Sequence, residues 1–144
     1  MPIYQCSAQP GLLTDDMKAQ IATAITDAHV DATGAPRVFV HVYFNQLPPG
    51  NAYSAGEPDH KLSGITGQVR AGRPLEVNQN LIQTIVASWS KITGQPAKEV
   101  LAGLTEIDSD MTMEYGLILP HPGGEKEWFA KNADALDGIS GTGL

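Results

Sequence analysis

Two stretches of the chain repeat apolar residues at the three- to four-residue spacing of an amphipathic helix. The apolar face of the first stretch is formed by Met17, Ile21, Ile25 and Ala28. The corresponding face of the second is formed by Val77, Leu81, Ile85 and Ile92. Each stretch ends in a glycine with a proline two positions later, the usual order of a left-handed C-cap and a helix-stopping residue. We therefore predict one helix between Thr14 and Gly34, and a second that has Pro74 at its first position and ends at Gly94.

Four strands are predicted around these helices. Residues 3–8 form a short strand before the first helix, and RVFVHVYFN (37–45) follows that helix with alternating apolar side chains. Residues 62–69 precede the second helix, and residues 100–107 follow it. Each half of the chain is thus predicted to run strand, helix, strand.

The two halves align with each other at an offset of sixty residues. ATGAPRVFV (32–40) matches ITGQPAKEV (92–100), and the helical stretches before them align at the same offset. Two right-handed βαβ units predict an α/β (α+β) fold, a four-stranded sheet with both helices on one face. The other face of the sheet would stay uncovered, which predicts its burial in an oligomer.

A chain of 144 residues is expected to form a single domain. We place the first βαβ unit at residues 2–46, a linker at 47–61, the second unit at 62–107 and a C-terminal arm at 108–129. The domain would then span residues 1–129. Residues 130–144 are expected to be a mobile tail.

Composition argues against several classes of function. The net charge of −7 disfavours nucleic-acid binding, and no apolar run reaches the roughly 18 residues that a membrane span requires. The N-terminus lacks the basic and apolar regions of a secretory signal peptide. The single Cys6 excludes an internal disulfide and suits a reducing compartment. We therefore expect a cytoplasmic protein without nucleic-acid or membrane partners.

Candidate chemistry lies where the repeat is broken. Pro2 follows the initiator methionine, and a strand gains nothing from a residue without an N–H group. If that methionine is removed, Pro2 becomes a secondary amine that can transfer protons. His29 occupies the position of Trp89 in the second unit, and Arg70 and Arg73 have no counterpart in the first. Two neighbouring guanidinium groups suit a small anion such as a carboxylate.

Other polar residues give weaker signals. The remaining histidines, His41, His60 and His121, show no metal-ligand spacing. Cys6 is expected to be a small buried residue, and VRAGRP lacks the spacing of a phosphate-binding loop. We therefore expect neither a metal nor another cofactor.

Several features in order resemble the tautomerase superfamily, most closely its cis-3-chloroacrylic acid dehalogenase group. They are the N-terminal proline, the duplicated βαβ unit, ITDAH at 25–29, RAGR at 70–73 and MEYG at 113–116. The similarity runs from Pro2 to about Phe129, because EYG followed by LILPHPGGEKEWF also resembles the C-terminal arm of that group. The resemblance implies a tautomerase-like fold and a homotrimer, with the N-terminal proline in a pocket at the end of its strand.

The resemblance implies a catalytic set made of Pro2, His29, Arg70, Arg73 and Glu114. Pro2 is the proton-transfer residue of this set, the two arginines bind the substrate carboxylate, and His29 assists in substrate binding. Glu114 corresponds to the acid that activates water in the dehalogenases. In that group a tyrosine partners the acid, and Gly103 stands in its place here.

The expected function is therefore proton transfer on a small enol, 2-keto or unsaturated carboxylate, as in a phenylpyruvate tautomerase. An α-amine has a reference pKa near 8, which burial and nearby arginines lower, so that Pro2 becomes a base at neutral pH. Glycine cannot orient water, so hydration or dehalogenation is expected only as a side activity. Two alternatives stay open. One is a true cis-3-haloacrylate dehalogenase or acetylene-acid hydratase, and the other is a non-catalytic trimeric binding module.

Overall fold

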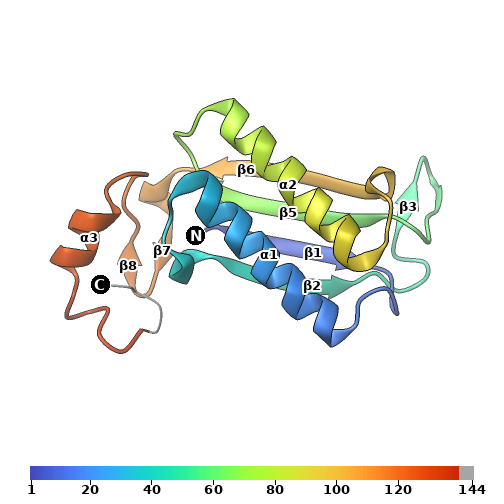
Figure 1. The fold of residues 1–144 in the computed structure, drawn as a ribbon, viewed down its shortest axis with the longest axis horizontal. Helices are drawn as coiled ribbons and strands as arrows, with labels where there is room; N and C mark the ends of the chain where they lie inside the picture. Colours follow the sequence, from blue (N-terminus) through green and yellow to red (C-terminus); the bar gives the residue numbers. More distant parts are fainter. Residues whose placement is uncertain (140–144) are drawn as a thin grey trace.

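A computed structural model describes residues 1–139 and contains two βαβ units (Figure 1). In the first unit, the strands β1 (Ile3–Ala8) and β2 (His41–Gln46) pair in parallel, and the helix α1 (Asp15–Thr33) connects them. Thr14 Oγ1 accepts a hydrogen bond from the N–H of Met17 at 3.1 Å and caps the start of α1. Gly34 ends the helix with a φ of 69°, the left-handed conformation predicted for it.

The second unit repeats this arrangement with β5 (Ser63–Arg70), α2 (Leu75–Thr93) and β6 (Val100–Ile107). β1 and β5 pair antiparallel, so the strand order is β2-β1-β5-β6. Gly94 ends α2 as predicted, with a φ of 76°, whereas Pro74 lies one residue before the helix rather than at its first position.

The strand predicted from residue 37 begins later than expected. Arg37–Phe39 forms a short 3-10 helix, in which the N–H of Phe39 donates to the carbonyl of Pro36 at 3.1 Å. Ala97–Glu99 does the same after Pro96 in the second unit. The turn buries Phe39 completely at its end. β2 therefore starts at His41 instead of Arg37.

Both helices pack on one face of the sheet, as Figure 1 shows. Alternate side chains of β1 point into this core, which is formed by Tyr4, Cys6, Ala8, Ile21, Ile25, Ala28, Ile65, Val69, Leu81, Ile85 and Trp89. The intervening residues face the opposite side of the sheet, where Gln5, Tyr43 and Thr66 are exposed. None of the helices within residues 1–139 is long and apolar enough to cross a bilayer.

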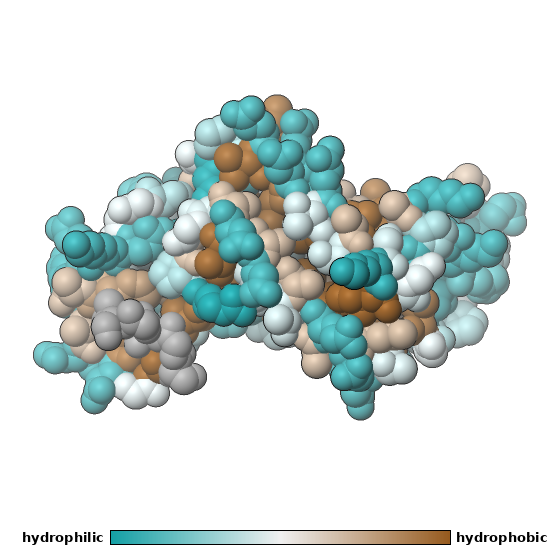
Figure 2. Space-filling model, in the orientation of Figure 1, coloured by the Kyte–Doolittle hydropathy of each residue, from teal (hydrophilic) through white to brown (hydrophobic). Residues whose placement is uncertain are grey.

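Residues 47–61 carry a small hairpin of β3 (Tyr53–Ser54) and β4 (Glu57–Pro58). The C-terminal arm contains the 3-10 helix at Ser109–Met111, the hairpin of β7 (Met113–Glu114) and β8 (Leu117–Ile118), and the helix α3 (Glu125–Lys131). In Figure 2 the arm forms a lobe beside the helix layer.

The arm packs around the start of the chain. Its buried cluster consists of Met1, Phe39, Leu119, Phe129 and Leu136. The boundary predicted at residue 129 falls inside α3, and Leu136 is only 3% exposed because it packs in this cluster. The ordered arm therefore extends into the segment expected to be a mobile tail. The remainder of that segment, residues 140–144, lies outside the described residues.

Candidate active site

The candidate site lies at the N-terminal end of β1, where β2, β5 and the arm meet. Pro2 is fully buried, and its carbonyl accepts a hydrogen bond from the N–H of His41 at 3.0 Å. Met1 is present in the structure, so the nitrogen of Pro2 is an amide and the free amine belongs to Met1. The surroundings of the Met1 amine therefore show in which kind of site the chain begins.

The amine of Met1 is buried and forms an ion pair with a carboxylate oxygen of Glu114. Burial, followed by the nearby positive charge of Arg70, lowers the pKa of the amine from 8.0 to about 5. Glu114 lies on β7, so the arm brings this acid to the start of β1. The predicted residues Glu114 and Arg70 thus have opposite effects on the protonation of this amine. The carboxylate of Glu114 favours the charged form, and the guanidinium of Arg70 disfavours it.

Arg70 is the last residue of β5 and is only 1% exposed. Its Nη1 donates to the carbonyl of Pro120 at 2.7 Å, and its Nη2 forms an ion pair with Glu125 at the start of α3. Glu125 was not singled out by the sequence, because it lies 55 residues from its partner. The predicted anion-binding arginine is therefore already paired with an acid of the arm.

Arg73 is the more accessible of the two arginines. It is half-buried, and its Nη1 donates to the carbonyl of Arg70 at 3.2 Å. Burial, followed by the charge of Arg70, lowers the pKa of Arg73. No acid is ion-paired with Arg73 among residues 1–139, so its guanidinium keeps donors for an incoming anion.

His29 lies on α1 and is 1% exposed. Its Nδ1 is hydrogen-bonded to the hydroxyl of Tyr4 at 2.8 Å, and the two rings meet edge to face. Burial, followed by the charges of Arg73 and Arg70, lowers the pKa of His29 from 6.5 to about 3. His29 is therefore neutral at physiological pH, and Tyr4 fixes its orientation.

His41 is a second residue that sequence reasoning missed. Its Nε2 contacts the second carboxylate oxygen of Glu114, although the two residues lie 73 positions apart. No motif of the sequence pointed to it, because its place follows from strand register: His41 pairs with Ile3 and so lies beside the start of β1. A cavity of about 190 Å³ opens here and is lined by Met1, Ile3, His41, Tyr43, Thr112, Met113 and Glu114.

Gly103 lies on β6, paired in register with Thr66. A Cβ atom at this position would meet no other atom within 4 Å in the chain. The position expected from the resemblance to hold a tyrosine is therefore open space on the exposed face of the sheet.

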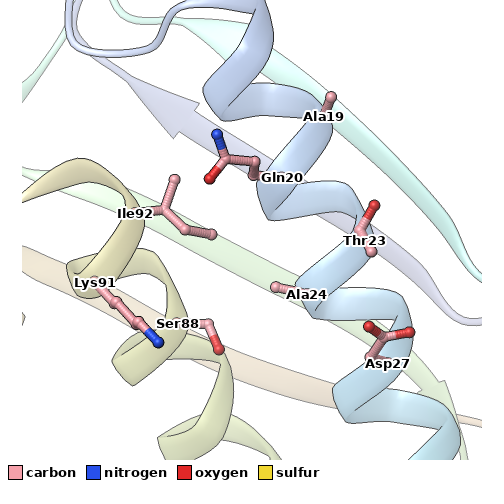
Figure 3. Close-up of a pocket in the computed structure, with 8 residues that line it drawn as sticks. All are labelled: Ala19, Gln20, Thr23, Ala24, Asp27, Ser88, Lys91 and Ile92. Carbon is pink, nitrogen blue, oxygen red and sulfur yellow. The ribbon is translucent and has the colours of Figure 1, made fainter.

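A larger cavity lies elsewhere, between the two helices (Figure 3). Its volume is about 650 Å³, and it is lined by Ala19, Gln20, Thr23, Ala24, Asp27, Ser88, Lys91 and Ile92. None of these residues belongs to the candidate site. Asp27 moreover forms an ion pair with Arg37 at 2.5 Å, so few polar groups of this groove are free to act together on a bound molecule.

One group of possible metal ligands occurs in the described chain. Asp108, Asp110 and His121 bring ligand atoms within 4.8 Å of one another, which the sequence spacing did not indicate. All three are exposed, and Asp108 already caps the 3-10 helix of the arm through the N–H of Asp110. His121 Nε2 lies 3.4 Å from a carboxylate oxygen of Asp110, so the three side chains already contact one another.

Comparison with known proteins adds independent information. A family model described as "Putative oxalocrotonate tautomerase enzyme" matches residues 1–133. The crystal structure of N1, a member of the cis-3-chloroacrylic acid dehalogenase family, superposes with a TM-score of 0.86. It is 30% identical and covers 94% of this chain and 99% of its own.

Two further similar proteins are relevant to the internal repeat of the chain. A fused 4-OT, solved as a symmetric trimer, has a TM-score of 0.73 and 26% identity, and covers 81% of this chain and 94% of its own. A "Probable tautomerase" of Lactococcus lactis subsp. lactis is 44% identical over 48 residues, which are 33% of this chain and 79% of that protein. That protein is therefore about as long as one βαβ unit, as expected for a duplicated chain.

Proposed function

Because this chain belongs to the family described as "Putative oxalocrotonate tautomerase enzyme", we propose that it is a tautomerase whose N-terminal Pro2 moves a proton. The substrate class is a small enol or 2-keto carboxylate, with phenylpyruvate as the representative. The proposal requires removal of Met1, which the small side chain of proline permits. Pro2 then carries the free secondary amine.

One observation carries this proposal: the chain begins in a buried site, where Pro2 is fully buried and the free amine lies beside Glu114. Burial and the charge of Arg70 lower the pKa of that amine, which belongs to Met1, to about 5. The amine of Pro2 would lie about one residue, roughly 4 Å, along the chain from that of Met1. Pro2 is itself fully buried, so we expect burial and the charge of Arg70 to lower the pKa of its amine as well. An amine that is largely neutral at pH 7 serves as a base, which is what ketonisation of an enol requires.

Anion binding falls chiefly to Arg73 in this proposal. Its guanidinium is half-buried and without an ion-paired acid in the described chain, so it can donate two parallel hydrogen bonds to a carboxylate. Arg70 contributes positive charge to the same site, and its three N–H groups beyond those used by Pro120 and Glu125 remain as donors.

His29 would orient the substrate as a neutral hydrogen-bonding group. Its lowered pKa excludes a positively charged imidazole at pH 7, so it does not act as a cationic acid. Tyr4 holds Nδ1, which leaves Nε2 as the atom that can reach a substrate.

We also propose a homotrimer. The sheet face opposite the helices exposes Tyr43 and Leu101 by 55% and 66%, and a second copy would cover these side chains. The related fused 4-OT, which is solved as a symmetric trimer, supports three copies rather than two.

The proposal is tested by ketonisation of phenylenolpyruvate, followed by ultraviolet absorbance, on protein whose intact mass proves loss of Met1. A matched control carries one additional uncleaved residue, so that Pro2 stays an amide. We expect activity only in the processed protein, and a large loss in Pro2→Ala. Equal activity in all three proteins would show that Pro2 is not the working group.

The binding-module alternative predicts a different result. If the site only holds a protein partner, the processed protein will not ketonise the enol, and Arg73→Ala will not change any rate. If the protein is an enzyme, Arg73→Ala should raise KM for the carboxylate substrate by at least tenfold while the fold persists. Circular dichroism spectra of the processed parent protein and of Arg73→Ala provide the control for folding.

A further inference from the structure

Glu125 brings a negative charge of the arm to the arginines of the candidate site. Its Oε1 is paired with Nη2 of Arg70, and its Oε2 accepts the N–H of Gly123 at 2.8 Å. The side chain of Glu125 is 17% exposed and that of Arg70 is 1% exposed, so solvent ions screen this pair little. An acid therefore already occupies part of the site that is expected to bind an anion.

We propose that Glu125 is a specificity-determining residue: it balances the charge of Arg70, leaves Arg73 as the one free cation of the site, and so excludes enols that carry two carboxylates. The inference rests on the proposed function, because it requires a carboxylate substrate at these arginines. It gives Glu125 a role in substrate selection in addition to its contacts within the arm.

The charge of Glu125 is present at neutral pH. Burial, the largest single effect, opposes its ionisation. The hydrogen bond and charge of Arg70 and the backbone hydrogen bonds together outweigh burial, so the pKa of Glu125 is lowered. The pair of Arg70 and Glu125 therefore carries no net charge for an incoming anion to balance.

The charge of Glu125 also reaches Arg73. Burial, followed by the charge of Arg70, lowers the pKa of Arg73, and the charge of Glu125 acts in the opposite direction. Glu125 is thus close enough to act on an anion that Arg73 binds. Glu106 on β6 acts on Arg73 in the same direction, but it is exposed and accepts a hydrogen bond from Asn78 at 3.0 Å. Glu106 is therefore the main competitor for this role.

The charges of the site determine which substrates it accepts. A monocarboxylate enol brings one negative charge, which Arg73 can balance with two parallel hydrogen bonds. A dicarboxylate brings a second charge, which would leave water without a free arginine to pair with and would lie near the like charge of Glu125. An unpaired charge of this kind is a general means of rejecting a wrong ligand.

These contacts do not involve Met1, whose removal the proposed function requires. Within residues 1–139, the side chains of Arg70 and Glu125 hydrogen-bond to each other and to backbone groups of the arm. The arm also packs on Phe39, whose ring stacks on that of Phe129 with the centroids 5.5 Å apart. We therefore expect the same ion pair in the processed protein.

The test compares two enols that differ only in the second carboxylate. They are 2-hydroxypenta-2,4-dienoate, a monocarboxylate, and 2-hydroxyhexa-2,4-dienedioate, which has a second carboxylate at the far end of the same diene. Ketonisation of each is followed by ultraviolet absorbance in processed protein. In the parent protein we expect kcat/KM for the dicarboxylate to be at least tenfold lower.

Glu125→Gln removes the charge and keeps the shape of the side chain. We expect it to raise the ratio of dicarboxylate to monocarboxylate kcat/KM by about tenfold, because a like charge beside the ligand is lost. The ratio does not depend on how much of the protein is active, so a purely structural role would lower both rates and leave it unchanged. A rise of less than threefold in protein that circular dichroism shows to be folded would overturn the role of Glu125.

Two further variants serve as controls. Glu127→Gln removes one charge from an exposed position of the same helix and should leave the ratio as it is in the parent protein. Glu106→Gln tests the competitor: if it, rather than Glu125→Gln, raises the ratio, the assignment of Glu125 is wrong.

The outcome also separates this inference from the proposed function. Equal kcat/KM for the two enols in the parent protein would overturn the role of Glu125 and leave the tautomerase standing. This comparison needs no variant, so it decides even if Glu125→Gln does not fold. Absence of ketonisation with phenylenolpyruvate and with both dienols would overturn the tautomerase itself.

Discussion

Arg70 and Glu125 join the end of the central strand β5 to the first turn of α3. The guanidinium is almost fully buried, and the carboxylate also accepts the N–H of Gly123 at 2.8 Å, which fixes the turn before the helix. This ion pair therefore determines where the arm lies over the start of β1. A substrate carboxylate that binds Arg70 would therefore share its guanidinium with Glu125.

Glu125→Gln should destabilise the protein by about 3 kcal/mol, because it leaves the buried charge of Arg70 without its counter-ion. Chemical unfolding followed by tryptophan fluorescence would measure this change, since Trp128, one of the two tryptophans, lies on the same helix. Glu127→Gln, an exposed change in the same helix, provides the control and should cost less than about 0.5 kcal/mol. Equal effects of the two substitutions would contradict a structural ion pair.

The same ion pair predicts how stability depends on pH. Burial, the largest single effect, opposes ionisation of Glu125. The hydrogen bond and charge of Arg70 and the backbone hydrogen bonds together outweigh it, so the pKa of Glu125 is lowered from its usual value of 4.5. An acid whose pKa is lower in the folded state stabilises the fold at pH values above its unfolded-state pKa. This stabilisation is lost as the pH falls through the folded-state pKa. Unfolding free energies of the parent protein should thus decline below about pH 4.5 more steeply than those of Glu125→Gln.

Much of the fold could be predicted from local patterns. Helix spacing, the Thr14 cap and the glycine C-caps are local signals, and the internal repeat then predicted two βαβ units in one sheet. The antiparallel pairing of β1 with β5, which joins the two units, was not predicted. The 3-10 turn at Arg37–Phe39 was missed because its apolar residues run directly into those of β2, although the turn buries Phe39 and leaves Val38 only partly buried. The extent of the arm was missed because Leu136 is buried by residues from distant parts of the chain.

The candidate site was predictable only in part. Pro2 stands out because it follows the initiator methionine, and His29 and Arg70 stand out because they break the repeat. His41 and Glu125 meet their partners across 73 and 55 positions, and neither lies in a motif. Such contacts arise from strand register and from the packing of the arm, which no local pattern encodes.

The pH profile of ketonisation should reflect the charge of Arg70. In the processed parent protein, the acid limb of kcat/KM should show an inflection well below 8, because burial and Arg70 lower the amine pKa. Arg70→Met removes the positive charge, so the inflection should shift upward, whatever the change in absolute rate. An unchanged inflection would show that burial alone sets the pKa of the amine.

Tyr4 should be needed to hold His29. Tyr4→Phe keeps the ring in the core but removes the hydroxyl that contacts Nδ1 at 2.8 Å. We expect a loss of about 1 to 2 kcal/mol of stability, because a buried ring nitrogen is left unpaired. Thermal unfolding measures the loss, and imidazole NMR should show a mixture of tautomers where the parent protein shows one.

Gly67 should be the least replaceable glycine of the sheet. A Cβ atom there would lie 2.6 Å from Leu104 Cδ2 and 2.7 Å from a ring carbon of Tyr4. Gly67→Ala must displace Tyr4, so we expect a loss of about 2 kcal/mol and a lower rate of ketonisation. Gly103→Ala is the matched control within β6, since its Cβ would meet nothing in the chain, and it should leave stability within about 0.5 kcal/mol in the isolated subunit.

The exposed face of the sheet should hold the oligomer together. Leu101 is 66% exposed on β6, although its neighbours Ala102 and Leu104 pack into the core. If three copies bury this face, light scattering of the parent protein should give three times the 15.3 kDa mass of one chain. Leu101→Asp places a charge in that interface and should shift the mass toward a single chain, because an unpaired buried charge is costly. Lys98→Glu, an exposed change just before the same strand, should leave the assembly intact. A parent protein that is monomeric at micromolar concentration would contradict the trimer, whatever the behaviour of the two variants.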